Sequence, residues 1–189
     1  ESALAQLWNS LGIEPRGLIG HSLGENTAAC VAGVLTFEDA LGLVRLRGEL
    51  MDAVPAGGML SVELPASELE KRLSDGLDLA SVNSPELSVA TGPEEELERL
   101  ADTLTAAGIE SKRIRINIAA HSRMLEGILE PFGNYLRSIT LNQPKIPFVS
   151  NRTGTWITDE QATDPDYWVS HLRNTVRFAE GVGTLLEDA

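Results

Sequence analysis

A serine between two glycines is the first place in this chain where residue types and spacing suit covalent chemistry. The run Gly20-His21-Ser22-Leu23-Gly24 follows an apolar run at 17–20 and precedes a small-residue helical pattern at 27–32. A strand that turns sharply into a helix exposes the serine hydroxyl and aims the next backbone N–H at a bound carbonyl oxygen. We therefore predict that Ser22 is a nucleophile and that the Leu23 N–H is an oxyanion donor. The alternative is a tight turn with an incidental serine.

An arginine lies among apolar residues in the next helical pattern. Thr36 followed by Asp39 has the spacing of a capping box, which predicts a helix that runs to about Ala53. Helical periodicity places Arg47 on the apolar stripe of this helix. A guanidinium stays protonated and is costly to bury without an anion. Two partners remain open, an internal carboxylate such as Glu25 or a carboxylate on a substrate.

A serine nucleophile needs a base, and the chain has three histidines. His121 precedes a helical pattern around Met124, where the helix dipole favours the neutral imidazole that a general base requires. His21 is expected to be held in the turn beside Ser22 and to point elsewhere, and His171 lies in a late helical pattern. We therefore predict His121 as the base, with a structural role as the alternative.

The order of the other elements predicts an α/β fold with an inserted subdomain. Strand patterns lie at 59–64, 77–83, 86–91 and 113–118, and helical patterns at 67–73 and 93–108. This β-α-β-β-α-β order is ferredoxin-like. We predict that residues 59–118 form a small subdomain, and that residues 1–58 and 119–189 form a larger one with strands near 17–20 and 146–150.

Composition excludes several classes of protein. The 189 residues carry a net charge of -13, and a surface that acidic repels phosphate backbones, so nucleic acid is not an expected partner. No apolar run approaches the roughly 20 residues that span a bilayer. The single cysteine excludes an internal disulfide and favours a reducing, cytoplasmic compartment. The chain starts at Glu1 inside a helical pattern, so we expect a piece of something longer.

The chain resembles the acyltransferase domains of modular polyketide synthases, which are related to the malonyl-CoA:acyl-carrier-protein transacylases. The resemblance follows the family's order across nearly the whole chain. It rests on GHSLGE (20–25), AACVAG (28–33), RGELM (47–51), NSP (83–85), HSRM (121–124), VSN (149–151), DYWV (166–169) and VRF (176–178).

This resemblance implies a hydrolase-like parallel sheet flanked by helices, with the ferredoxin-like insert as one wall of the cleft. It implies a dyad of Ser22 and His121, with a backbone carbonyl near His171 holding the imidazole. It implies that Arg47 grips the free carboxylate of a dicarboxylic acyl group. We place Leu23, His21 and His171 with Arg47 among the substrate-binding residues.

The same resemblance implies the substrates and partners. The donor is an acyl-CoA thioester, with malonyl-CoA favoured, and the acceptor is the phosphopantetheine thiol of an acyl carrier protein. Neighbouring synthase domains are expected partners, whereas a metal, a tightly bound cofactor, nucleic acid and membrane are not.

The sequence departs from the family pattern in three places, one of which is Asn26, where an aromatic or large apolar residue is expected. The other two bear on activity. The family's N-terminal strand, with a second oxyanion donor, lies upstream of Glu1, so the chain alone is expected to react slowly. The tetrapeptide Ile118-Ala119-Ala120-His121 matches neither the HAFH form associated with malonyl nor the YASH form associated with methylmalonyl, while Leu23 favours malonyl. Two other functions remain open. One is a serine hydrolase or thioesterase, which has no need of Arg47, and the other is a docking module without activity.

Overall fold

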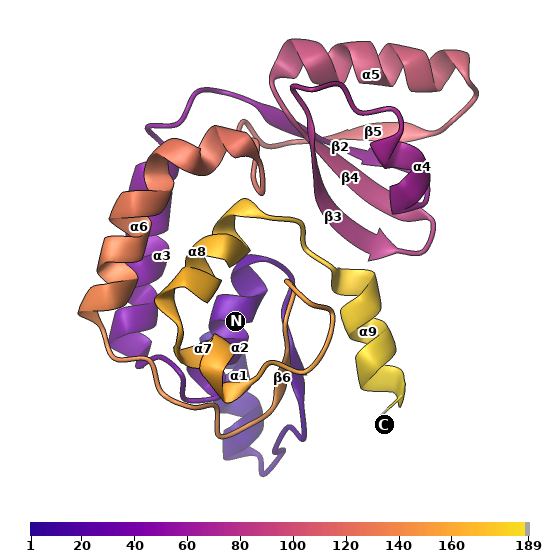
Figure 1. The fold of residues 1–189 in the computed structure, drawn as a ribbon. Helices are drawn as coiled ribbons and strands as arrows, with labels where there is room; N and C mark the ends of the chain where they lie inside the picture. Colours follow the sequence, from indigo (N-terminus) through magenta and orange to yellow (C-terminus); the bar gives the residue numbers. More distant parts are fainter. Residues whose placement is uncertain (188–189) are drawn as a thin grey trace.

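Two sheets organise the chain in the computed structural model, which describes residues 1–187 (Figure 1). Strands β1 (Leu18–Ile19) and β6 (Phe148–Val149) form a parallel pair. An antiparallel sheet has the order β3-β4-β2-β5 and consists of β2 (Gly58–Val62), β3 (Asp78–Ser84), β4 (Leu87–Gly92) and β5 (Ser111–Ile114). The predicted fold class, a hydrolase-like α/β protein with a ferredoxin-like insert, is confirmed.

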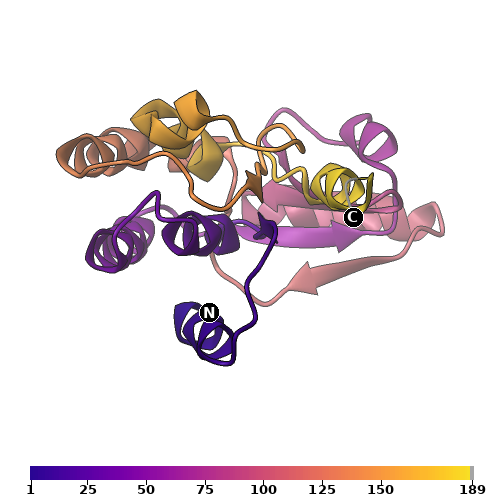
Figure 2. The ribbon, with the colours of Figure 1, turned by 90° about the horizontal axis from the view of Figure 1, so that it is seen from below.

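Helices surround the parallel pair and supply most of its core. They are α1 (Ser2–Ser10), α2 (Leu23–Val31), α3 (Phe37–Met51), α6 (Glu126–Ser138), α7 (Asp159–Thr163), α8 (Pro165–Arg173) and α9 (Phe178–Glu187). The buried rings of Phe148 and Trp168 stack in this core. Helix α1 stands at the edge, beside α2 (Figure 2).

Helix α3 begins where the sequence predicts. The Asp39 N–H donates to Thr36 Oγ over 3.0 Å, so the threonine satisfies one of the free donors of the first turn. Leu43 of this helix is buried, whereas Arg45 faces solvent and pairs with Glu49 at 2.8 Å. The cap therefore fixes the start of α3, and Arg47 lies one turn after the buried Leu43, on the same side of the helix.

Helices α4 (Ala66–Glu70) and α5 (Glu94–Ala106) pack against the antiparallel sheet, and α5 lies across it in Figure 1. The buried side chains of Leu97, Leu100 and Leu104 recur at helical spacing and form the core of this part with the sheet.

The predicted strand at 113–118 is wrong in its second half. Strand β5 pairs with β2 from Ser111 opposite Val62 to Ile114 opposite Met59, and it ends there. Strand β2 begins at Gly58, so residues beyond Ile114 have almost no partner strand left. The alternating isoleucines continue a strand-like pattern after the ladder stops, and Ile116 is 40% exposed.

Candidate active site

Ser22 lies in the turn between β1 and α2, in a strained conformation. Its φ is 53° and its ψ is -115°, and α2 begins at the next residue, earlier than the small-residue pattern at 27–32 indicates. A Cβ on Gly20 would lie 2.0 Å from the carbonyl carbon of Gly24, so only glycine fits there. A Cβ on Gly24 would meet only Glu1 Oε2, at 4.0 Å, which is ordinary van der Waals contact. The close approach of the two backbones holds the serine at the end of β1.

The structure brings His121 to this serine. The Ser22 hydroxyl lies 2.7 Å from His121 Nε2, and His121 Nδ1 lies 2.9 Å from the backbone oxygen of Asn174. A carbonyl oxygen only accepts, so Nδ1 carries the proton and Nε2 is free to accept the serine proton. Asn174, which lies just after α8, is the carbonyl that we expected near His171. No local pattern in the sequence indicates that Asn174 supplies this carbonyl.

The surroundings of His121 keep its ring neutral. Burial lowers the pKa of His121 to about 3, and the nearby His171 and Arg47 act in the same direction, against the Asn174 carbonyl. We predicted neutrality from a helix dipole. Burial is instead the main cause, since only a three-residue 3₁₀ turn at 123–125 follows His121 before α6.

Arg47 reaches the same point from α3. Its Nη2 lies 3.4 Å from Ser22 Oγ, and within residues 1–187 no carboxylate oxygen lies within 4 Å of its nitrogens. Burial lowers the pKa of Arg47 to about 10, although part of its surface stays exposed. A charge that is crowded by protein yet reachable from outside suits an anion brought by a ligand.

Glu25 is not the partner of Arg47, so the internal carboxylate that the sequence offered is excluded. Its fully buried carboxylate accepts from the Asn151 N–H at 2.6 Å and from the Tyr167 hydroxyl, and it lies 3.3 Å from His171 Nε2. Burial, and then the charge of Glu25, raises the pKa of Tyr167. The carboxylate that the sequence offered to Arg47 is thus committed to a network beneath the nucleophile.

Asn151 joins that network to the nucleophile turn. Its Oδ1 accepts from the Ser22 N–H at 2.8 Å, and its Nδ2 donates to the Gly20 oxygen at 2.7 Å. We expected no role for it from the sequence. A signal existed, however, because Asn151 follows β6, and the carboxyl ends of parallel strands meet at one edge of a sheet.

The remaining predicted residues lie around the dyad. His21 Nε2 lies 2.8 Å from Asn83 Oδ1 of β3, and its ring packs on Phe178. The buried His171 ring is edge-on to His121 at 6.2 Å. Neither ring contacts the Ser22 hydroxyl. The Leu23 N–H opens α2 and makes no hydrogen bond within the described part of the chain, so it is available to an oxyanion.

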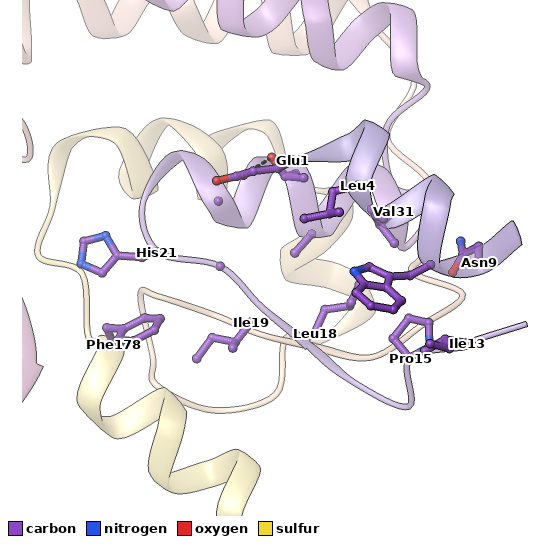
Figure 3. Close-up of a pocket in the computed structure, with 16 residues that line it drawn as sticks. Glu1, Leu4, Asn9, Ile13, Pro15, Leu18, Ile19, His21, Val31 and Phe178 are labelled. Atoms are coloured by element: carbon purple, nitrogen blue, oxygen red, sulfur yellow. Dashed lines mark hydrogen bonds between the residues drawn. The ribbon is translucent and has the colours of Figure 1, made fainter. Parts of the chain in front are cut away.

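A cavity of about 780 Å³ lies on another side of this turn, between α1, α2 and β1 (Figure 3). Apolar side chains such as Leu4, Trp8 and Leu18 form much of its wall, and His21 and Phe178 lie at one end. Ser22 does not line it, so this cavity is distinct from the dyad.

A serine in a strained turn after a parallel strand, with a neutral histidine at 2.7 Å, is the arrangement of α/β serine hydrolases and acyltransferases. The chain belongs to the acyl transferase domain family, whose model matches residues 1–189. None of the helices within residues 1–187 is long and apolar enough to span a membrane.

Several polyketide synthases are similar to the chain in sequence. Component PikAIII of the pikromycin synthase of Streptomyces venezuelae is 42% identical over 190 residues, which cover 98% of the chain and 12% of that protein. The polyketide synthase GfsB of Streptomyces halstedii is 37% identical over 188 residues, which cover 97% of the chain and 3% of that protein. The chain thus spans only a small part of these relatives.

Solved structures of acyltransferases are similar to the chain in both sequence and fold. The acyltransferase domain of SpnD, in complex with 2-(pent-4-yn-1-yl)malonyl, is 45% identical with a TM-score of 0.95, covering 98% of this chain and 45% of that one. The malonyl-CoA:ACP transacylase of Synechocystis is 26% identical with a TM-score of 0.88, covering 100% and 64%. The chain therefore shares its family and its fold with the acyltransferase domains of polyketide synthases and with the transacylases.

Proposed function

We propose that the chain moves a dicarboxylic acyl group, with malonyl favoured, from CoA to the phosphopantetheine thiol of an acyl carrier protein. The observation that carries this proposal is Arg47, whose guanidinium lies 3.4 Å from Ser22 Oγ without a carboxylate partner among the described residues. A malonyl group attached through one carboxyl has a second, free carboxylate that supplies the missing anion.

In the first half of the reaction, Ser22 Oγ attacks the thioester carbonyl of the acyl-CoA while His121 Nε2 takes the hydroxyl proton. The Leu23 N–H stabilises the oxyanion that forms on the carbonyl oxygen. The tetrahedral intermediate collapses with cleavage of the C–S bond, and the imidazolium gives its proton to the CoA sulfur. The products are free CoA and an ester on Ser22.

In the second half, the carrier protein's thiol attacks the ester and His121 takes the thiol proton. The C–O bond to Ser22 breaks, and the proton passes to Ser22 Oγ. The Asn174 carbonyl keeps the same nitrogen of His121 facing the serine in both halves. Water must stay out, because it would hydrolyse the ester. The carrier protein and neighbouring synthase domains are the proposed partners, and no tightly bound cofactor is needed.

The proposed preference for malonyl rests on fewer residues than the proposed reaction does. Leu23, in the nucleophile turn, favours malonyl, whereas the tetrapeptide at 118–121 matches neither family form. A hydrolase of neutral acyl thioesters is the alternative function, and Arg47 counts against it because such an enzyme gains nothing from a cation beside the nucleophile.

Intact mass measurement tests the proposal. The protein is incubated separately with malonyl-, methylmalonyl- and acetyl-CoA, and Ser22→Ala serves as the blank. A malonyl adduct that is absent from the blank supports the ester and the substrate. A methylmalonyl adduct in its place keeps the mechanism and overturns the interpretation of Leu23. Release of free acid without an adduct from any dicarboxylic donor moves the protein to the hydrolases.

A further inference from the structure

We propose that Asp78 is a positioning residue for the His121 imidazole, because it fastens both segments that hold this ring to the first residue of β3. The proposal rests on the function proposed above, since the step it affects is acyl transfer at Ser22. Asp78 touches none of the reacting atoms and acts through its neighbours.

The first segment is the one that carries His121. Asp78 Oδ2 accepts from the Arg123 backbone N–H at 2.7 Å and from Arg123 Nε at 3.1 Å, and Oδ1 accepts from Arg123 Nη2 at 3.0 Å. Arg123 lies two residues after His121, whose φ of 56° is unusual for a residue other than glycine. A carboxylate that holds the backbone this close to His121 restrains the backbone that aims the ring.

The second segment carries the carbonyl partner of His121. Arg173 immediately precedes Asn174, and its guanidinium lies between two carboxylates, with Nη2 3.3 Å from Glu126 Oε1 and 3.9 Å from Asp78 Oδ1. The chain then runs along β3, where the Thr175 hydroxyl donates to the Leu79 oxygen at 2.7 Å. The next residue continues this pairing, because the Val176 N–H donates to the Ala80 oxygen at 2.9 Å. The ring and its carbonyl acceptor are therefore both attached to the start of one strand.

The charge of Asp78 suits this role. Its side chain is only 17% exposed, and burial by itself would raise the pKa of the carboxyl. The hydrogen bonds from Arg123 and the charges of Arg173 and Arg123 outweigh burial and lower that pKa, so the carboxylate is charged at neutral pH. Hydrogen bonds to a charged acceptor are the stronger kind, which suits a fixed attachment.

The attachment matters because β3 also reaches the nucleophile. At the other end of the strand, Asn83 Oδ1 lies 2.8 Å from Nε2 of His21, the residue before Ser22. Strand β3 belongs to the antiparallel sheet and Ser22 follows the parallel one, so the contacts of β3 link base and nucleophile across the two sheets. A displacement of a reacting group by about 1 Å costs on the order of 100-fold in rate.

The test compares three variants in the Ser22 acylation assay with malonyl-CoA. Asp78→Ala removes both carboxylate oxygens and leaves Arg123 only the backbone oxygens of Asp75 and Leu77. Asp78→Asn keeps one side-chain oxygen for the Arg123 N–H. Glu94→Gln is the control, because it removes the charge from another carboxylate–arginine pair, which joins Glu94 of α5 to Arg113 of β5 in the same sheet. Each variant is measured per folded protein, as the limiting acylation rate and the half-saturating malonyl-CoA concentration.

We expect Asp78→Ala to lose about 10- to 100-fold in limiting rate with the half-saturating concentration almost unchanged, because Arg47 is untouched. Asp78→Asn should recover part of the rate, and Glu94→Gln should keep all of it. The downfield proton resonance of His121 Nδ1–H should broaden in Asp78→Ala and stay sharp in the control. A purely structural Asp78 would lower the folded fraction and leave both the rate per folded protein and this resonance intact, which would overturn the proposal.

Two further measurements distinguish a positioning role of Asp78 from a failure to fold and from a failure of the proposed function. If Asp78→Ala does not fold, Arg123→Gln replaces it, since that side chain is 48% exposed and its backbone N–H remains. An unchanged rate in both Arg123→Gln and Asp78→Asn overturns the proposal. A fluorophosphonate labels an activated serine without needing a dicarboxylate. If the unaltered protein fails to react with malonyl-CoA, the proposed function fails, and the order of labelling rates among the variants still decides the role of Asp78.

Discussion

Replacing Arg47 by methionine should stabilise the protein while it removes the preference for a carboxylated acyl group. Methionine keeps an unbranched, adaptable side chain that fills the inner part of the arginine's space, and it removes the charge. In most proteins the loss of a buried charge is damaging because its partner is left behind. Here Glu25, the internal carboxylate that the sequence offers to Arg47, is bound to other groups. Removing the Arg47 charge therefore leaves no carboxylate unpaired.

The size of the effect follows from the pKa of Arg47. Burial lowers this pKa from 12.5 to about 10, and each pH unit corresponds to roughly 1.4 kcal/mol. Both values lie above neutral pH, so the side chain is charged in the folded and the unfolded protein and the whole cost applies at pH 7. That cost is about 3 kcal/mol at most. Solvent screening of the exposed part of Arg47 reduces it to about 1–3 kcal/mol.

Two assays check this prediction. For a chain of this size, about 1–3 kcal/mol raises the Tm by roughly 2–10 °C, which thermal unfolding detects. Rates of Ser22 acylation with malonyl-CoA and acetyl-CoA should become similar in Arg47→Met, through a loss with malonyl-CoA. Arg45→Met is the control, because Arg45 lies on the exposed face of α3 in a pair with Glu49. Its Tm and its acyl preference should change little.

A lower unfolding temperature for Arg47→Met than for the unaltered protein would contradict the stability prediction, since the guanidinium would then be stabilised by an anion of the folded chain. A variant that still prefers malonyl-CoA over acetyl-CoA would contradict the predicted role of Arg47 in acyl selection. Arg47→Lys separates charge from geometry, because lysine keeps the cation and loses the planar fork that binds a carboxylate with two hydrogen bonds.

Three further predictions concern the dyad and its support. Asn151→Asp keeps the acceptor for the Ser22 N–H but places a carboxylate oxygen against the Gly20 oxygen. It should therefore lower the free energy of unfolding by about 1–3 kcal/mol, measured with denaturant, and slow acylation. An unchanged unfolding midpoint would contradict this prediction. With a folded pKa of about 3, His121 should stay neutral and the acylation rate flat from pH 8 to pH 5. The unfolded chain binds the His121 proton below about pH 6.5, so stability should fall toward pH 3 with a slope of up to about 1.4 kcal/mol per pH unit from this residue. His121→Asn should lack that part of the slope. Gly20→Ala places a Cβ 2.0 Å from the Gly24 backbone, so it should cost about 3 kcal/mol or more. Gly24→Ala should cost less, because its Cβ would meet only Glu1 Oε2, at 4.0 Å.

The sequence by itself determined the parts that depend on short-range rules. The turn at Ser22 follows from backbone crowding at Gly20, and the start of α3 follows from the Thr36 cap, three residues from its donor. The ferredoxin-like order follows from alternating periodicity and turn residues. Such effects act over a few residues, so they can be worked out from the chain alone. They also put Arg47 on the correct helix, though not beside a particular partner.

Only the tertiary structure decided which distant groups meet. It brought His121 rather than His21 or His171 to Ser22, across 99 residues of chain. It committed Glu25 to Asn151 and Tyr167 and left Arg47 without a carboxylate among the residues described. It also ended β5 at Ile114, because the partner strand ends there while the periodic pattern continues. These outcomes depend on packing, register and burial summed over the whole molecule, which no local pattern encodes.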